Sequence, residues 1–157
     1  MISCVRITAS QSKTVMNNAR ILITGAGGFL GEHIGRYFFS KGHEVAGVGR
    51  FRRSLPWRTW EMSLPDNQFA AVLSDFSPHV LIHCAGTSSV VASVEHPLAD
   101  FHNNVDVCAF TLDAVRQQAP SCQFLLLSSA SVYGNPVDLP VAETASCSPI
   151  SPYGYHK

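Results

Sequence analysis

The sequence has little charge and no excess of either sign. Only 14% of its 157 residues are charged, and 11 Lys and Arg balance 11 Asp and Glu, so the formal net charge is zero. This excludes the broad basic surface that is typical of nucleic-acid or anionic-membrane binding. No apolar run approaches the roughly 18 residues that span a bilayer, so we expect neither a nucleic-acid nor a membrane partner.

The sequence also lacks a cysteine pattern. Its five cysteines are odd in number and contain no C-x-x-C pair, which predicts neither a disulfide framework nor a zinc site. They are Cys4, Cys84, Cys108, Cys122 and Cys147. His79 and His83 bracket a predicted strand instead of lying on a helix, so we expect no metal. A reducing, cytoplasmic location is the default expectation for such a chain.

What the sequence does have is apolar residues, at 46%, and the length of one domain. Residues 1–19 are polar, without periodicity and without the apolar region of a signal peptide. We expect them to be disordered or a mis-annotated extension, with Met16 as an alternative start. Residues 20–157 carry the domain.

Strand and helix signals alternate from Arg20 onward, which predicts an α/β fold. Apolar runs predict strands at 21–24, 43–49, 60–63, 79–84 and 124–128. Periodicity predicts helices at 28–41, 66–75 and 95–118, and a proline-punctuated loop at 135–149. Strands that are apolar on both faces favour a parallel sheet covered on both sides. The long helix 95–118 has an apolar stripe that could be left partly exposed.

A glycine-rich turn joins the first strand to the first helix. It reads Gly25-Ala26-Gly27-Gly28-Phe29-Leu30-Gly31. In this context one glycine allows the tight turn, one lets the backbone approach a pyrophosphate, and one lets the helix pack on the strand. A flexible strand–helix loop is the alternative. The context favours a dinucleotide site in a Rossmann-like, doubly wound sheet.

Five motifs in order resemble the extended short-chain dehydrogenase/reductase family, which contains NAD(P)-dependent nucleotide-sugar epimerases, dehydratases and reductases. They are T-G-A-G-G-F-L-G at 24–31, H-C-A-G at 83–86, N-N-V at 103–105, L-S-S-A-S-V-Y-G at 127–134 and Tyr-x-x-x-Lys within 151–157. The proteins similar to UDP-galactose 4-epimerase are the nearest group within that family. The resemblance covers residues 20–157.

The resemblance implies a catalytic set of Ser129, Tyr153 and Lys157. Tyr153 would exchange a proton with a substrate hydroxyl, Lys157 would share its helix face at i+4, and Ser129 would hydrogen-bond the same substrate oxygen. Ser131, two residues along the expected strand, is a second candidate. The implied cofactor-binding residues are Gly25, Gly28, Phe29, Leu30, Gly31, Arg50, Ala85, Gly86, Asn103, Tyr153 and Lys157. Asn103 is preferred over Asn104 for the cofactor side.

The choice between the two nicotinamide cofactors depends on the end of the second strand. No carboxylate occurs between Glu44 and Glu61 to hold ribose hydroxyls, whereas four arginines fall within nine positions, starting at Arg50. An arginine there can bind a 2′-phosphate, so NADP(H) is favoured and NAD(H) remains open. A solvated loop face is the alternative reading of the arginines.

The resemblance also limits the reaction. Sugar dehydratases carry Thr-Asp-Glu where this chain has Ser129-Ala130-Ser131, so a 4-epimerase or a 4-keto reductase acting on a nucleotide sugar remains. The sequence stops at Lys157, at the start of the expected catalytic helix. We therefore expect an N-terminal cofactor-binding fragment, inactive alone, with a possible homodimer contact through 95–118. A non-catalytic NADP-binding module and a non-functional truncated gene product are the alternatives.

Overall fold

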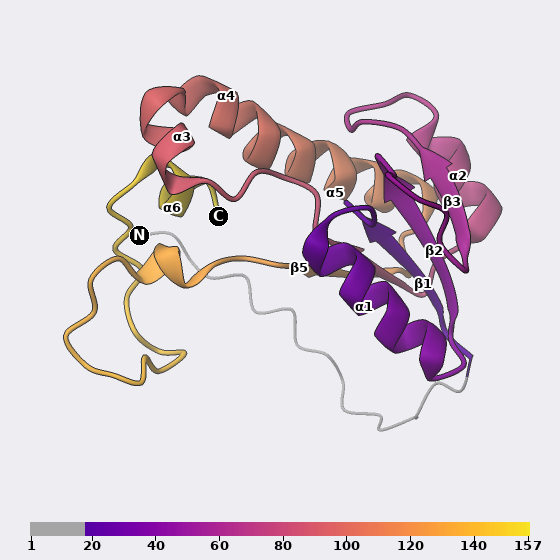
Figure 1. Ribbon diagram of the computed structural model, residues 1–157, viewed down its shortest axis with the longest axis horizontal. Coiled ribbons are helices and arrows are strands. Elements are labelled where there is room, and N and C mark those ends of the chain that lie inside the picture. The colour runs from indigo at the N-terminus through magenta and orange to yellow at the C-terminus, as the bar shows by residue number, and fades with distance from the viewer. Residues whose placement is uncertain (1–17) are drawn as a thin grey trace.

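The computed structural model describes residues 18–157, so the expectations for residues 1–17 lie outside the described part. Five parallel strands form one sheet in the order β3-β2-β1-β4-β5 (Figure 1). The strands are β1 (Arg20–Thr24), β2 (Glu44–Gly49), β3 (Arg58–Glu61), β4 (Val80–His83) and β5 (Gln123–Leu126). This order confirms the Rossmann-like α/β fold, in which β1 lies at the point where the strand order reverses.

The helices follow the strands in the expected alternation. They are α1 (Phe29–Ser40), α2 (Phe69–Phe76), α3 (Val90–Glu95), α4 (Pro97–Phe101), the π-helix η1 (His102–Asp106), α5 (Val107–Gln118), the 3-10 helix η2 (Ala130–Tyr133) and α6 (Pro152–His156). Figure 1 shows α1 against one face of the sheet, and α3, α4 and α6 together at the end of the molecule farthest from α2. No helix within residues 18–157 is long and apolar enough to cross a membrane.

Alternate residues of the central strands feed two separate cores. Leu22 packs with residues of α2 and α5, while Ile21 and Ile23 pack with Ile34 and Phe38 of α1. Successive strand side chains point to opposite faces of a sheet, so both faces of β1 are buried. This is the two-sided covering that the apolar strands predict.

The first strand is held at its N-terminal end by two histidines. The Ala19 amide donates to Nδ1 of His43 at 3.2 Å, and the Arg20 amide donates to Nδ1 of His79 at 3.0 Å. Ala19 is itself buried. His79 therefore accepts a backbone hydrogen bond, and no three potential metal ligands gather anywhere in the described residues.

The helix expected over 95–118 runs from Pro97 to Gln118 as α4, η1 and α5, with the π turn η1 as its one irregularity. His96, with φ −134° and ψ 65°, separates it from the unexpected helix α3. The buried face runs along Asp100, Asn104, Val107, Thr111 and Val115. The apolar stripe that was expected to be partly exposed lies beside it, with Leu98 67% and Leu112 44% exposed.

Two strand boundaries also differ from the sequence expectation. The third strand covers Arg58–Glu61 instead of 60–63. The fifth strand ends at Leu126, so Ser129 and Ser131 do not share a strand face as expected. Ser129 instead caps η2, its hydroxyl accepting the Ser131 amide at 3.2 Å, because a serine side chain competes well for the free amides at a helix start.

His83 is the buried polar residue at the end of β4. It is 2% exposed, its Nδ1 bonds the Thr24 hydroxyl at 2.9 Å, and its ring stacks on Phe124. Nε2 has no hydrogen-bond partner among the described residues. Burial, with a smaller contribution from the Lys157 charge, lowers the pKa of His83 from 6.5 to about 4. The ring is therefore neutral in the folded chain at neutral pH.

This lowered pKa predicts acid sensitivity. Between pH 6.5 and about 4 the unfolded chain binds a proton at His83 that the folded chain does not, so stability falls as the pH falls through that window. The full effect is about 3 kcal/mol in the free energy of unfolding. The His83→Asn side chain keeps a hydrogen bond to Thr24 but cannot titrate. In urea unfolding, its loss of unfolding free energy between pH 7 and pH 4 should be smaller than that of the wild type by this amount.

The matched control is His96→Asn, at an exposed histidine, which should keep the wild-type difference between pH 7 and pH 4. An unchanged pH dependence in His83→Asn would contradict the assignment.

Candidate functional site

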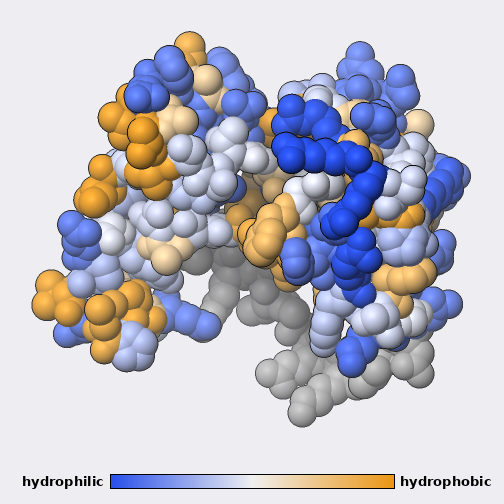
Figure 2. All heavy atoms as spheres, in the orientation of Figure 1, coloured by the Kyte–Doolittle hydropathy of each residue, from blue (hydrophilic) through white to orange (hydrophobic). Residues whose placement is uncertain are grey.

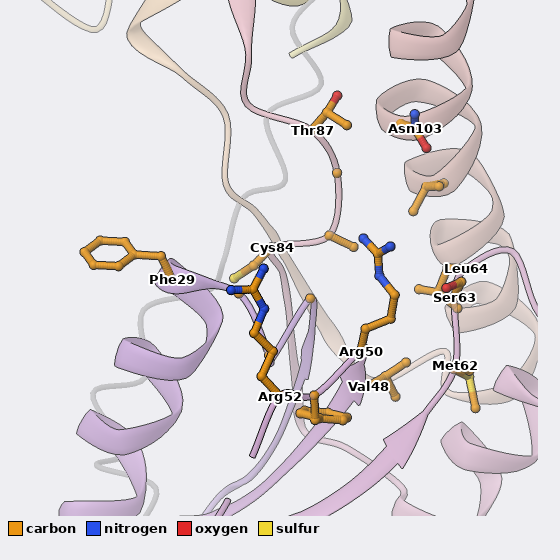
Figure 3. A pocket seen from close by; sticks show the side chains of 18 residues that line it. Phe29, Val48, Arg50, Arg52, Met62, Ser63, Leu64, Cys84, Thr87 and Asn103 are labelled. Carbon is orange, nitrogen blue, oxygen red and sulfur yellow. The ribbon is translucent and has the colours of Figure 1, made fainter. Parts of the chain in front are cut away.

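A cavity of about 760 Å³ opens at the carboxyl ends of the central strands, where the order of the sheet reverses (Figure 3). Ligands of open α/β sheets bind at this position. Its volume is in the usual range for small-molecule and cofactor sites. It is lined by Gly25, Gly27, Gly28, Phe29, Val48, Gly49, Arg50, Phe51, Arg52, Met62, Ser63, Leu64, Cys84, Ala85, Gly86, Thr87, Asn103 and Val107.

The glycine turn approaches its neighbours too closely for side chains. A Cβ on Gly27 would lie 1.9 Å from the Arg50 carbonyl oxygen, and one on Gly31 would lie 2.3 Å from the Gly25 carbonyl oxygen. Gly25 has φ +66°, which favours glycine. The turn therefore brings backbone against the ends of β2 and β4. Gly28 caps α1 without a side-chain hydrogen bond, which leaves first-turn amides available to an anion.

The four clustered arginines separate into two pairs with different surroundings. Arg53 bonds Glu32 at 2.5 Å, and Arg58 bonds Asp75 at 2.5 Å. Arg50 and Arg52 line the cavity and extend into view from the loop after β2 in Figure 3. Neither makes an ion pair within residues 18–157. Their charge is therefore available to an anionic ligand. Lining a cavity favours that role over the alternative of a loop face that only contacts solvent.

The loop after β4 forms the opposite wall. Gly86 has φ +135°, and a Cβ there would lie 2.5 Å from Oδ1 of Asn104. That same oxygen accepts the Thr87 amide at 3.2 Å. Asn103 lines the cavity, whereas Asn104 is buried and holds the loop. The π turn gives these adjacent asparagines different surroundings, which suits a functional site.

Tyr153 lies on α6, and Lys157 directly follows that helix. Tyr153 is buried, and its amide donates to the buried Ser93 hydroxyl of α3 at 3.1 Å. The Lys157 Nζ lies 5.8 Å from the centre of the Tyr153 ring, and 3.3 Å from where a Cβ on Gly86 would be. Burial lowers the pKa of Lys157, while the charge of Asp100 opposes that shift. The ammonium thus lies near both the Tyr153 ring and Gly86 of the cavity wall.

Ser129 reaches the same region through η2. A Cβ on Gly154 would lie 2.7 Å from the Ser131 carbonyl oxygen, so η2 and α6 meet backbone to backbone just beside Tyr153. Ser129 stands at the N-terminal cap of η2 and is partly buried. The structure therefore brings the segments of Ser129, Tyr153 and Lys157 to one side of the loop after β4.

The cofactor residues expected from the sequence divide into two groups. Those that line the cavity are Gly25, Gly28, Phe29, Arg50, Ala85, Gly86 and Asn103. Leu30 and Gly31 do not line it: Leu30 is 56% exposed, and Gly31 is buried beneath the turn. Tyr153 and Lys157 do not line it either, although the Lys157 Nζ lies beside Gly86. Phe29 is 78% exposed and points away from the cavity in Figure 3.

Several other residues line the cavity, and all of those named below except Cys84 lie outside the five sequence motifs. Met62, Ser63 and Leu64 directly follow β3, and a correct boundary for that strand would have placed them at the carboxyl edge of the sheet. Thr87 follows β4 in the same way. Cys84 adds an inert surface, because burial raises the pKa of its thiol to about 11 and keeps it protonated at neutral pH.

Comparison with known proteins gives a family match over nearly all of the described chain. The family model described as "NAD dependent epimerase/dehydratase family" matches residues 21–157. UDP-glucose 4-epimerase of Mycolicibacterium smegmatis is 30% identical over 149 residues, which cover 88% of this chain and 48% of that protein. Methionine adenosyltransferase 2 subunit beta of Bos taurus is 31% identical over 140 residues, covering 89% and 41%.

Solved structures agree with this match. UDP-glucose-4-epimerase from Stenotrophomonas maltophila, with bound NAD and formylated UDP-arabinopyranose, superposes with a TM-score of 0.81 at 29% identity, covering 89% of this chain and 46% of that one. The UDP-Glc/GlcNAc 4-epimerase from Campylobacter jejuni gives 0.81 at 26% identity, with the same coverage. The chain spans less than half the length of these relatives.

Proposed function

Because the chain belongs to the NAD dependent epimerase/dehydratase family, we propose that it supplies the dinucleotide-binding and catalytic part of a UDP-sugar 4-epimerase. The observation that carries this proposal is the position of the Lys157 Nζ beside Gly86 of the cavity wall and near the Tyr153 ring. The names of the epimerase relatives favour epimerisation over 4-keto reduction.

The residues present fit a nicotinamide dinucleotide. Three features agree with its chemistry: side-chain-free backbone at the turn, an uncapped start of α1 beside the cavity, and two arginines free of ion pairs within the described chain. Backbone amides and arginines would hold the pyrophosphate and ribose side. When bound, the dinucleotide would take a hydride from the sugar carbon and return it.

The chain's own residues would handle the proton. The Tyr153 phenolate oxygen would accept the proton of the sugar hydroxyl and would return it to the same sugar oxygen at the end of the reaction. The Lys157 Nζ lies 5.8 Å from the centre of the Tyr153 ring. Ser129 would bond the same sugar oxygen and fix its position. The Ser93 hydroxyl fixes the backbone of Tyr153.

Substitution of the proposed proton acceptor tests the reaction directly. In the protein at its natural length, Tyr153→Phe should lower kcat for interconversion of UDP-glucose and UDP-galactose by about 100-fold or more, because positioned acid–base groups contribute that much. Coupled turnover assays measure the change. Tyr155→Phe, on the same helix and 72% exposed, is the matched control and should stay within about twofold. Equal activity of the two variants would contradict the role of Tyr153.

A second candidate is a dinucleotide-binding module without turnover. The Bos taurus relative favours it, since that protein is named as a subunit of a methionine adenosyltransferase. The same assay separates the two candidates: a wild-type protein that binds NADH or NADPH tightly but does not interconvert UDP-sugars is the module.

The cofactor preference is part of this proposal. Arg50 and Arg52 line the cavity, and no carboxylate follows β2 to bond ribose hydroxyls, so we propose NADP(H) over NAD(H). The structural neighbour from Stenotrophomonas maltophila holds NAD, which makes NAD(H) the alternative outcome.

Removing one cavity arginine tests this preference. Arg50→Gln should raise the Kd for NADPH about tenfold, since a hydrogen bond between charged groups contributes about 1.5 kcal/mol or more, and should change the Kd for NADH by less than about twofold. Fluorescence titration with both cofactors measures it. Arg58→Gln, from the same cluster but bonded to Asp75, is the control. A wild-type protein that binds NADH more tightly would overturn the preference.

We also propose that two copies associate through the helix formed by α4, η1 and α5. Its partly exposed apolar side chains include Leu98, Phe101 and Leu112. Figure 2 shows hydrophobic residues gathered at the end of the molecule that carries α3 and α4. Burial of such side chains between two copies would remove them from water.

A charge placed on this helix tests the association. Leu112→Glu should convert a dimer to a monomer in sedimentation velocity, because an unpaired carboxylate would be buried in the contact. Val137→Glu, at a 97% exposed loop position, makes the same chemical change elsewhere and should leave the dimer intact. A Leu112→Glu protein that sediments as the wild type would contradict this contact.

A further inference from the structure

Asp100 is a buried carboxylate that joins three separate parts of the fold. Its side chain is 4% exposed. Oδ1 accepts the Thr87 hydroxyl at 2.8 Å, from the loop after β4, and the Asn104 amide at 3.1 Å, from η1. Oδ2 accepts Nδ1 of His156 at 2.7 Å, from α6. Thr87, 13 positions before Asp100, and His156, 56 positions after it, thus bond the same side chain.

The chemistry of these contacts fixes their direction. An ionised carboxylate can only accept hydrogen bonds, so Nδ1 of His156 carries the proton whether the ring is neutral or charged. Both oxygens of Asp100 have donors, which a buried carboxylate requires. The His156 ring also packs edge-on against Phe101, with 5.4 Å between ring centres. His156 therefore has one orientation determined by two neighbours.

The position of this pair relates it to the proposed catalytic groups. Helix α6 has five residues, too few to be stable by itself, and His156 is its last residue, between Tyr153 and Lys157 in the sequence. Thr87, on the other side of Asp100, lines the cavity. A displacement of His156 would therefore shift α6 relative to the wall that faces the cofactor site.

A second pair of the same chemistry shows what is particular about this one. His102 and Asp106 are 2.5 Å apart at i and i+4, but their side chains are 58% and 46% exposed. They connect residues of one helix only. The Asp100–His156 pair is buried and connects separate elements, so its geometry constrains the tertiary structure.

We propose that Asp100 and His156 are positioning residues that hold Tyr153 and Lys157 against the Gly86–Thr87 wall. This inference rests on the proposed function, in which those two residues act on the sugar. Asp100 and His156 touch neither substrate nor cofactor in it. They act by fixing the orientation of α6 on the loop after β4, with Ser93 as the second fixed point.

Three variants of the protein at its natural length test the proposal. His156→Phe keeps the aromatic ring against Phe101 but removes the donor to Asp100. His156→Asn restores a donor close to the position of Nδ1. His102→Ala cuts the exposed pair without adding apolar surface and serves as the control. Each is measured for UDP-sugar turnover and for hydrogen–deuterium exchange of residues 152–157.

The expected pattern separates positioning from general stability. His156→Phe should lower kcat about 10- to 100-fold with KM for the UDP-sugar within about twofold, because small misplacements of reacting groups cost this much. Exchange in α6 should become faster. His156→Asn should recover most of both, and His102→Ala should change neither. Unchanged kcat in His156→Phe, despite faster exchange in α6, would reduce the pair to a stability role and overturn the proposal.

Two further outcomes remain decisive. If His156→Phe does not fold, the double variant Asp100→Asn/His156→Phe removes the stranded charge and undergoes the same measurements. If the wild type does not interconvert UDP-sugars, the proposed function fails. Hydrogen–deuterium exchange alone then tests whether Asp100 and His156 anchor α6. Faster exchange of residues 152–157 in His156→Phe, restored in His156→Asn, supports the anchor, and unchanged exchange overturns it.

Discussion

The contact between the turn after β1 and the ends of β2 and β4 determines the rest of this site. It joins backbone to backbone, and a single methyl group on Gly27 would overlap the Arg50 carbonyl. Because the turn fits so closely, α1 begins directly at the edge of the sheet. The cavity thus receives amides from one side and arginines from the other. Its position follows from the reversal of strand order at β1.

A polar network connects this cavity to α6. The Gly86–Thr87 segment is held by Asn104 and Asp100, and the same carboxylate reaches His156. Each buried polar atom in this chain of contacts has a partner, in keeping with the cost of leaving such atoms unpaired. The network lies at the end of the molecule where the apolar packing of the sheet gives way to short helices. Hydrogen bonds there hold neighbouring segments together, as apolar packing does around β1.

Local patterns in the sequence were enough to predict the strands, the glycine turn and the shared face of Tyr153 and Lys157. Each of these depends on residues close together in the chain. The interruption at His96, the π turn and the cap at Ser129 were not predicted, because they depend on contacts between distant segments. Asp100 and His156 carried no signal, since nothing in a single sequence pairs residues 56 positions apart. The apolar stripe of 95–118 is partly exposed as expected, but the sequence did not predict that the buried face beside it is partly polar.

The π turn at His102–Asp106 has a consequence for chain length. A π turn accommodates one residue more than an α turn, so α4 and α5 follow two rotational frames that differ by about 100°. Asp100 and Asn104 face inward in the first frame, and Val107, Thr111 and Val115 face inward in the second. A regular α-helix over the same number of residues would rotate one half by about 100° against the other, and one of the two halves would then turn away from its present partners. The π turn therefore lets each half keep its own buried face.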